Sequence, residues 1–312
     1  MPRRLTALVA SLLVTLPLLL WAAPSHAAAP SYVALGDSYS SGVGTRSYIS
    51  DGTSCERSTY AYPRLVAASL GYALSFQACS GAKVSDVTSK QLGALSAGTS
   101  FVTVSVGGND AGFTGTLTEC AKPGWLSNCS AAISKANTYI SKTLPAALAT
   151  LYGAIRGRAP HATVVVVGYP RLFNGEDCNA LTWFSPTEES SLNATADRLN
   201  GVLANAAAAQ GFSFANPTHV FIGHAVCGSP EWLNGLSNPV SESYHPNRTG
   251  HASGYAPLVS PLLTGASLTV TQRVLAAARA QGPALAAHQR HYAAADRSIR
   301  PERFGTPYAG VR

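Results

Sequence analysis

The sequence predicts an α/β fold in which helices cover both faces of a parallel β-sheet. Short apolar runs alternate with helix-like stretches along most of the 312 residues. These runs are apolar at every position, as in strands that are buried on both faces, rather than alternating with polar residues. Strands and helices that alternate along a chain form βαβ units, whose strands lie parallel. We therefore expect one central parallel sheet.

The first half of the chain provides three strands and a helix. Residues 32–35 form an apolar run that stops at Gly36, and they predict the first strand. Residues 63–70 have a helical composition, and residues 73–78 predict a second strand. Residues 101–106 are rich in β-branched side chains and end at two glycines, which predicts a third strand.

The second half continues this order. Residues 132–158 predict one or two helices, with Pro145 as a break or as part of a first turn. Residues 163–167, Thr-Val-Val-Val-Val, are the clearest buried strand. Residues 187–210 carry leucine and alanine at helical spacing and predict a long helix, which Thr187 would cap. Residues 220–222 predict a short last strand, and residues 250–263 a final helix of the core.

The N-terminus has the pattern of a secretory signal peptide over residues 1–29. Two arginines precede an apolar run from residue 5 to residue 23, and small residues then offer cleavage after Ala27 or Ala29. An uncleaved membrane anchor is the alternative, but Pro17 and the alanine-rich end favour cleavage. We therefore expect a secreted, extracellular protein.

The formal net charge of +7 lies entirely in the two ends of the chain. Residues 1–29 carry two arginines and no acid, whereas residues 30–265 carry 13 basic and 13 acidic residues. Residues 266–312 carry seven arginines against Asp296 and Glu302. A neutral body argues against binding to nucleic acid.

We expect a core domain over residues 30–265 and, beyond it, a basic extension over residues 266–312 that is partly helical or disordered. A solvated extension is one interpretation. The other is that its arginines hold the protein against anionic lipid or an envelope polymer. We expect a monomer.

The six cysteines agree with export, because an even number in an exported chain suggests three disulfides. Sequential pairing is the simplest choice, since each bridge then closes a local loop, and free buried thiols are the alternative. No two cysteines have the Cys-x-x-Cys spacing, and no cluster of histidines and acids has metal-ligand spacing. We expect neither a metal nor another cofactor.

Four segments that follow the strands or lie near the end of the core carry the candidate chemistry. They are Gly36-Asp37-Ser38-Tyr39, Cys79-Ser80-Gly81-Ala82, Gly107-Gly108-Asn109-Asp110 and Ser243-Tyr244-His245-Pro246-Asn247. In an open parallel sheet, ligands bind beyond the carboxyl ends of the strands. The segments provide a serine, a glycine amide, an asparagine amide and a histidine. This set suits acyl transfer, in which histidine accepts the proton of a serine nucleophile and fixed N–H donors stabilise an oxyanion.

These four blocks, in this order, resemble the SGNH (GDSL-type) hydrolases over residues 30–265, and most of all their secreted actinomycete lipase, esterase and phospholipase branch. The resemblance implies a three-layer α/β/α flavodoxin-like fold. It also implies Ser38 as the nucleophile and His245 as its base, with an oxyanion hole formed by the backbone N–H groups of Ser38 and Gly81 and the side chain of Asn109. Three sequential disulfides follow from it as well: Cys55–Cys79, Cys120–Cys129 and Cys178–Cys227.

One position departs from the family pattern. The family has aspartate three residues before the catalytic histidine, and here that residue is Glu242. Its carboxylate would orient His245 as the third member of a triad. A main-chain carbonyl between Ser241 and Ser243 would orient the imidazole instead in a dyad, which we favour because glutamate is one methylene longer.

Two other histidines compete with His245 for the role of base. His251 is expected inside a helix as a structural residue, and His224 lies in a loop flanked by glycine. Asp37 is expected to bind local backbone amides rather than to act as an acid.

Three functions fit the sequence. The first is a secreted hydrolase of lipid or small acyl esters. The second is an O-deacetylase of polysaccharides with the same fold, and the third is a non-catalytic surface protein. The complete set of candidate site residues argues against the third, and an aromatic content of only 8% gives little support to the second.

Overall fold

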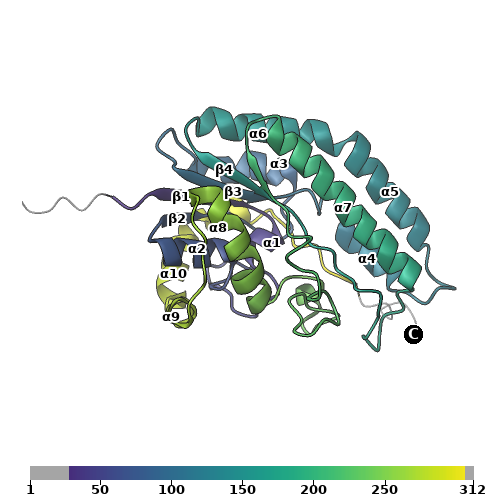
Figure 1. Cartoon of the computed structure of the whole chain (residues 1–312). Coiled ribbons are helices and arrows are strands. Elements are labelled where there is room, and N and C mark those ends of the chain that lie inside the picture. Colours follow the sequence, from purple (N-terminus) through teal and green to yellow (C-terminus); the bar gives the residue numbers. More distant parts are fainter. Residues whose placement is uncertain (1–27, 306–312) are drawn as a thin grey trace, which may run out of the picture.

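The computed structural model describes residues 28–305, so the predicted signal peptide lies outside the described residues except for its last two positions. Five parallel strands form one sheet in the order β2-β1-β3-β4-β5. Figure 1 labels β1 to β4 at the centre of the molecule. The strands are β1 (Ser31–Gly36), β2 (Ala73–Phe76), β3 (Phe101–Ser105), β4 (Thr163–Val167) and β5 (Ser213–Ala215). Within residues 28–305, none of the helices combines the length and apolarity that crossing a membrane requires.

Helices cover both faces of the sheet (Figure 1). One face carries α4 (Phe113–Cys120), α5 (Cys129–Lys142), α6 (Leu144–Arg158) and α7 (Pro186–Ala208), beside the short α3 (Val84–Asp86). The other face carries α2 (Tyr62–Leu70) and α8 (Ala256–Thr264), with a π-helical turn, Gly250–Tyr255, leading into α8. The predicted three-layer α/β/α class is confirmed. Pro145 lies in the first turn of α6, where its missing N–H removes no intrahelical hydrogen bond.

Two expected elements are placed differently. The last strand is Ser213–Ala215, paired with β4, and not residues 220–222, which lie in a turn. The apolar run at residues 220–222 resembles a strand in sequence. In the structure Phe221 packs inward while Ile222 is 66% exposed, so the run has no buried strand face. The long helix is capped by Ser185, whose hydroxyl accepts from the N–H of Glu188, rather than by Thr187.

The extension folds onto the core over its described part. It forms α9 (Gln272–Ala280), α10 (Gly282–Gln289) and α11 (Ala293–Asp296), and α9 packs against α2. Asp296 forms a buried ion pair with Arg57, which also pairs with Asp51 at 2.9 Å. The helical part of the expectation is present, but these contacts differ from those of a solvated extension. No sequence pattern linked Asp296 to an arginine 239 residues earlier.

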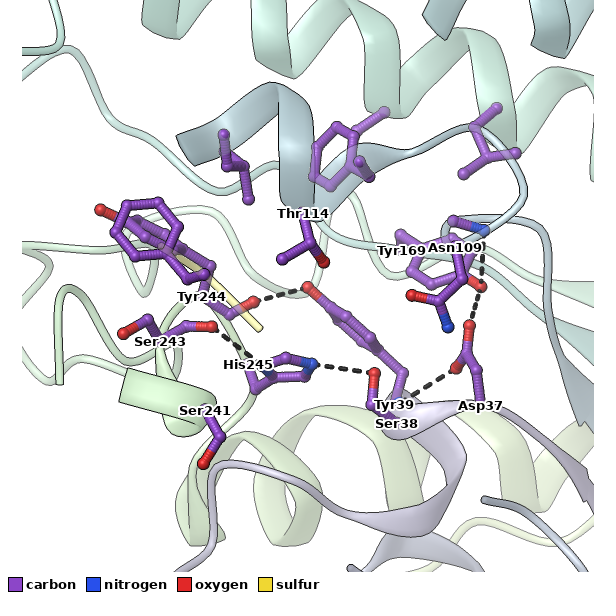
Figure 2. A pocket seen from close by; sticks show the side chains of 16 residues that line it. Asp37, Ser38, Tyr39, Asn109, Thr114, Tyr169, Ser241, Ser243, Tyr244 and His245 are labelled. Carbon is purple, nitrogen blue, oxygen red and sulfur yellow. Dashed lines mark hydrogen bonds between the residues drawn. The ribbon is translucent and has the colours of Figure 1, made fainter. Parts of the chain in front are cut away.

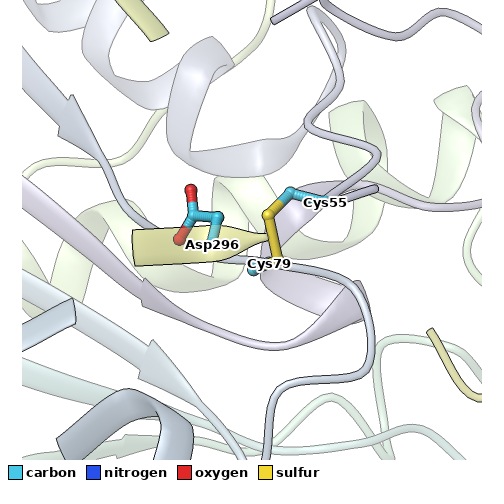
Figure 3. A group of neighbouring side chains, drawn as sticks. All are labelled: Cys55, Cys79 and Asp296. Atoms are coloured by element: carbon cyan, nitrogen blue, oxygen red, sulfur yellow. A yellow bond between two sulfur atoms is a disulfide. The ribbon is translucent and has the colours of Figure 1, made fainter. Parts of the chain in front are cut away.

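All six cysteines are paired in the structure, as Cys55–Cys79, Cys120–Cys129 and Cys178–Cys227. These are the pairs that the family resemblance implies. The bridge between Cys55 and Cys79 ties the loop before α2 to the loop that follows β2, and Asp296 lies beside it (Figure 3). The extension is therefore anchored next to a loop that carries candidate site residues.

Candidate active site

The candidate nucleophile lies at the carboxyl end of β1, near the centre of the sheet. Gly36 ends the strand, and Asp37 caps the short helix α1 (Ser38–Ser41) by accepting from the N–H of Tyr39 at 3.0 Å. The cap places Ser38 in the first turn of α1. Gln91 fixes the end of β1 with two hydrogen bonds to Gly36. The side-chain N–H of Gln91 donates to the Gly36 carbonyl, and the side-chain oxygen of Gln91 accepts from the Gly36 N–H.

Ser38 and His245 are in direct contact, although 207 residues separate them. The Nε2 atom of His245 lies 2.8 Å from the Oγ atom of Ser38 (Figure 2). On the other side of the ring, Nδ1 lies 2.9 Å from the main-chain carbonyl oxygen of Ser243. A carbonyl can only accept, so Nδ1 carries the hydrogen in the neutral ring and Nε2 is left as an acceptor for the serine hydroxyl. This is the protonation state that a base requires.

Burial keeps the imidazole neutral. Loss of hydration lowers the pKa of His245 from 6.5 to about 4, and the hydrogen bond to the Ser243 carbonyl opposes this effect only in part. The ring is thus ready to accept a proton over the whole neutral range. The imidazolium that forms after proton transfer has only the carbonyl dipole to stabilise it on this side.

Two tyrosines fix the backbone around the histidine. The hydroxyl of Tyr39 donates to the carbonyl oxygen of Tyr244 at 2.8 Å, and its ring lies 5.3 Å from the imidazole between centroids. Tyr244 adopts a φ of 59°, a left-handed conformation that non-glycine residues rarely occupy. The Tyr39 hydroxyl therefore ties the nucleophile helix to the strained residue that precedes His245.

Asp37 has the structural role that the sequence predicts, with an additional partner. Its second carboxylate oxygen accepts from the hydroxyl of Tyr169 at 2.5 Å (Figure 2). Burial raises the pKa of Asp37 from 3.8 to about 7, against the opposing effect of the hydrogen bonds from Tyr169 and from the Tyr39 N–H. Asp37 has no hydrogen bond to His245, so it does not complete a triad.

Glu242 does not reach His245. Its side chain is buried, and one carboxylate oxygen accepts a hydrogen bond from the hydroxyl of Tyr48, whose oxygen in turn accepts from the N–H of Gly44 at 3.1 Å. The alternative of Glu242 as orienter is therefore not the arrangement observed. The 3₁₀ turn Val240–Glu242 directs the carboxylate to Tyr48, while the Ser243 carbonyl occupies the place beside Nδ1. This geometry is that of the dyad.

The three candidate oxyanion donors lie on neighbouring loops. Asn109 lines the same pocket as Ser38, and its side-chain amide donates to the carbonyl of Ala82 at 3.1 Å, which ties its loop to that of Gly81. An Asn amide carries two hydrogens, so one is left for a ligand. Within residues 28–305, the backbone N–H groups of Ser38 and Gly81 donate no hydrogen bond to another protein atom. In the described part of the chain, each of the three groups thus keeps an N–H that no protein atom accepts, as an oxyanion donor requires.

The competing histidines have other partners. His251 is fully buried, and its Nδ1 accepts from the N–H of Tyr62 at 3.2 Å. Burial lowers the pKa of His251 to about 3. His224 stacks on the ring of Trp232 at 3.8 Å between centroids and bonds the carbonyl of Pro230. Neither histidine has a contact with Ser38, and His251 has the structural role expected of it.

A mostly apolar pocket opens beside the pair of Ser38 and His245. It contains about 580 Å³ of space free of protein atoms, a volume that includes open solvent at its mouth. Its walls come from α4, α7 and the loop before His245, with apolar side chains at Phe113, Leu117, Ala196, Leu199 and Tyr244. Phe304, from the extension, also lines it. The sequence offered no signal for Phe304, or for the roles of Tyr39, Tyr169 and Gln91, because each acts through residues distant in the chain.

The residues that could be considered for a metal ion do not form a metal site. In the part of the chain that the structure describes, one group brings three potential ligand atoms within 4.8 Å of one another, and it consists of Cys55, Cys79 and Asp296 (Figure 3). Both sulfur atoms belong to a disulfide, and the carboxylate is paired with Arg57. A disulfide sulfur is not a thiolate, which is the form that binds metals.

Comparisons with known proteins place this geometry in a family. Residues 34–253 match the GDSL-like Lipase/Acylhydrolase family. A lipase of Streptomyces rimosus is 46% identical over 264 residues, which cover 82% of this chain and 97% of the relative. Lipase 1 of Streptomyces coelicolor is 47% identical over 241 residues, which cover 76% of this chain and 88% of the relative.

Solved structures of two Streptomyces enzymes match this fold. The crystal structure of the extracellular lipase from Streptomyces rimosus matches with a TM-score of 0.71 at 46% identity, covering 75% of this chain and 100% of that one. Phospholipase A1 from Streptomyces albidoflavus matches with a TM-score of 0.70 at 41% identity, covering 74% and 98%. Because the family match spans well over half of the chain, and these relatives cover most of it, the protein belongs to the GDSL-like lipase/acylhydrolase family and is a carboxylic ester hydrolase.

Proposed function

We propose that the protein is a secreted hydrolase of lipid or small acyl esters that works through an acyl-enzyme on Ser38. The observation that carries this proposal is the 2.8 Å contact between Ser38 Oγ and His245 Nε2 beside an apolar pocket. A serine hydroxyl next to an unprotonated imidazole nitrogen is the arrangement that activates a serine nucleophile.

In the acylation step, Ser38 Oγ attacks the ester carbonyl carbon while His245 Nε2 takes the hydroxyl proton. The carbonyl oxygen becomes an oxyanion, which accepts hydrogen bonds from the N–H groups of Ser38 and Gly81 and from the Asn109 side chain. The imidazolium then gives its proton to the leaving alkoxide as the ester C–O bond breaks. The products of this step are the acyl-enzyme and an alcohol.

Deacylation repeats the same steps with water. His245 takes a proton from a water molecule, and the resulting hydroxide attacks the carbonyl carbon of the acyl-enzyme. Collapse of the second tetrahedral intermediate returns the proton to Ser38 Oγ and releases the carboxylic acid. His245 acts as base and then as acid in each half, with its Nδ1–H held on the Ser243 carbonyl throughout.

The pocket favours an acyl chain as the group that it binds. Its apolar walls bury hydrocarbon, whereas a polysaccharide O-deacetylase needs polar partners for sugar hydroxyls around a small acetyl group. The names of the relatives, a lipase and a phospholipase A1, agree with lipid esters as substrates. Three disulfides and an extracellular relative support secretion.

We also propose peripheral contact with an anionic surface through the extension. Six of its arginines are exposed, namely Arg273, Arg279, Arg290, Arg297, Arg300 and Arg303. Basic side chains near an anionic bilayer contribute about 1 kcal/mol each to binding. Such contact would bring the pocket close to a lipid substrate.

A panel of substrates tests the activity. The purified protein is assayed with p-nitrophenyl esters from acetyl to palmitoyl, with phosphatidylcholine and with acetylxylan. We expect the wild-type protein to hydrolyse acyl esters and to release little acetate from acetylxylan. Ser38→Ala should lose all of this hydrolysis. Ser40→Ala is the matched control, because this buried serine lies in the same helix and bonds Tyr62 instead. Ester hydrolysis that survives Ser38→Ala would refute the proposal.

A further inference from the structure

The segment that follows α11, residues 297–305, crosses the molecule from the Cys55 loop to helix α4, and we call it the C-terminal strap. At its start the carbonyl of Ile299 accepts from the hydroxyl of Ser54, and the Ile299 side chain is buried. At its end the N–H of Gly305 donates to the hydroxyl of Thr118 on α4 at 2.9 Å. Between these points Glu302 pairs with Lys83 at 3.2 Å. The strap is thus held along its length.

The strap passes directly over Gly81, the glycine whose N–H is a candidate oxyanion donor. A Cβ atom at Gly81 would lie 2.1 Å from the carbonyl oxygen of Arg300 and 2.7 Å from the Cα atom of Pro301. Gly81 also has a φ of 79°, which favours glycine. The missing side chain therefore leaves the space through which the strap runs beside the catalytic centre.

Beyond this crossing, the strap inserts a side chain into the active-site pocket. Phe304 is only 4% exposed and lines the pocket together with Ser38, Phe113 and Leu117. Its ring lies 5.0 Å from that of Tyr244 between centroids, in a tilted arrangement. Phe304 therefore occupies apolar volume that an acyl chain would otherwise fill.

The strap lies outside the part of the chain that matches the family, which ends at residue 253. The match to the Streptomyces rimosus lipase spans that entire chain but only 75% of this one. The residues proposed for the chemistry, from Ser38 to His245, thus all precede the strap. Phe304 therefore lies outside both the family match and the set of residues proposed for the chemistry.

We propose that Phe304 determines the acyl chain length that the enzyme accepts, because a long chain must displace its ring from the pocket. This inference rests on the proposed function and deepens it. Phe304 contacts Tyr244 rather than the Ser38 hydroxyl or the imidazole, so its effect falls on the apolar part of the substrate and not on the reacting atoms. The wild-type enzyme should therefore prefer short acyl chains.

The test compares kcat/KM for p-nitrophenyl octanoate with that for p-nitrophenyl acetate in full-length variants. One methylene group in an apolar pocket changes kcat/KM about 10- to 200-fold. For Phe304→Ala we expect the octanoate-to-acetate ratio to rise at least about tenfold, mainly through a lower KM for octanoate. Phe304→Trp should lower the ratio. A chain that ends at Pro301 removes Phe304 but keeps the contacts at Ile299 and Gly81, and it should behave like Phe304→Ala.

The matched control is Tyr292→Ala, since Tyr292 is an aromatic residue of the same extension that bonds Ser75 and does not line the pocket. Its ratio should stay at the wild-type value. The inference is overturned if the octanoate-to-acetate ratio of kcat/KM is unchanged in Phe304→Ala and in the shortened chain. It is also overturned if kcat/KM rises equally for both esters. Phe304→Leu, which keeps an apolar side chain, tests the same ratio if the alanine variant does not fold. Wild-type protein that hydrolyses neither ester would refute the proposed function instead.

Discussion

The main-chain carbonyl of Ser243 lies 2.9 Å from Nδ1 of His245, on the side of the ring opposite Ser38. Serine hydrolases commonly place a carboxylate there. A carbonyl fixes the tautomer and the orientation of the ring as well as a carboxylate does, but it brings no negative charge to stabilise the imidazolium. The nearest acid in the sequence, Glu242, bonds Tyr48 instead.

This arrangement predicts a mild effect of Glu242→Gln. The substitution removes a charge but keeps the shape of the side chain and its acceptor for Tyr48, so we expect kcat on a soluble ester to fall by less than about tenfold. Loss of an orienting carboxylate in a triad costs about 10⁴-fold in kcat. Steady-state kinetics of the purified variant decide the question. A loss of several orders of magnitude, with the melting temperature preserved, would mean that the carboxylate assists His245.

The pH dependence of kcat/KM should show one acidic limb with a midpoint near 4. Burial lowers the pKa of His245 from 6.5 to about 4, so the neutral imidazole is present above this value and is lost as the pH falls through it. Activity should then be level through the neutral range. Asp37, whose pKa burial raises to about 7, bonds Tyr169 and the Tyr39 N–H rather than His245, so Asp37→Asn should keep the midpoint near 4. A midpoint near 7 that persists in Asp37→Asn would contradict the prediction for His245.

Asn109→Ala should lower kcat on a soluble ester by about 10²- to 10³-fold with little change in KM. This is the cost of losing one side-chain donor to an oxyanion, and it falls on the transition state rather than on the bound ester. Asn200→Ala is a control for destabilisation, because this buried asparagine binds the backbone of Tyr169 behind the site. Equal losses of kcat in both variants, matched by equal drops in melting temperature, would argue against the oxyanion role.

Asp296→Ala should destabilise the protein. It leaves the fully buried Arg57 guanidinium with only Asp51 as a charged partner, and breaking a buried pair costs about 3–5 kcal/mol. The melting temperature should fall by several degrees. Asp197→Ala breaks a surface pair with Arg171 and should cost about 1 kcal/mol or less. Equal melting temperatures for both variants would show that the extension is not stabilised through Asp296.

Replacing three exposed arginines of the extension by glutamine should weaken binding to anionic vesicles at low salt by about 100-fold, at roughly 1 kcal/mol per side chain. The substitutions are Arg273→Gln, Arg279→Gln and Arg290→Gln, all of which precede the strap in the sequence. The control carries three equivalent changes on the opposite helical layer: Lys142→Gln, Arg158→Gln and Arg198→Gln. Cosedimentation with phosphatidylglycerol vesicles measures both sets. The same loss in both would mean that net charge, rather than the extension, governs binding.

Local pattern was enough to predict the architecture of the core. The apolar runs at residues 32–35 and 163–167 became β1 and β4, because a strand buried on both faces must be apolar throughout. The failures were also local. Residues 213–215 are only partly buried and mix polar with apolar side chains, so they lacked the pattern of the strand that they form. Ser185 was missed as a cap because Thr187, two residues on, offered the same kind of hydroxyl.

The sequence by itself determined which residues could carry the chemistry of this protein. Ser38, Gly81, Asn109 and His245 were recognisable because each belongs to a short block whose residue types the reaction requires. Only the tertiary structure decided what surrounds them: the Ser243 carbonyl beside His245, the bond of Glu242 to Tyr48, and Phe304 in the pocket. The bond of Glu242 to Tyr48 and the packing of Phe304 in the pocket join residues that are about 60 to 260 or more positions apart. The placement of the Ser243 carbonyl depends on a backbone turn that Tyr39 holds from over 200 residues away. Contacts of this kind depend on how distant segments pack, and no local periodicity or motif encodes them.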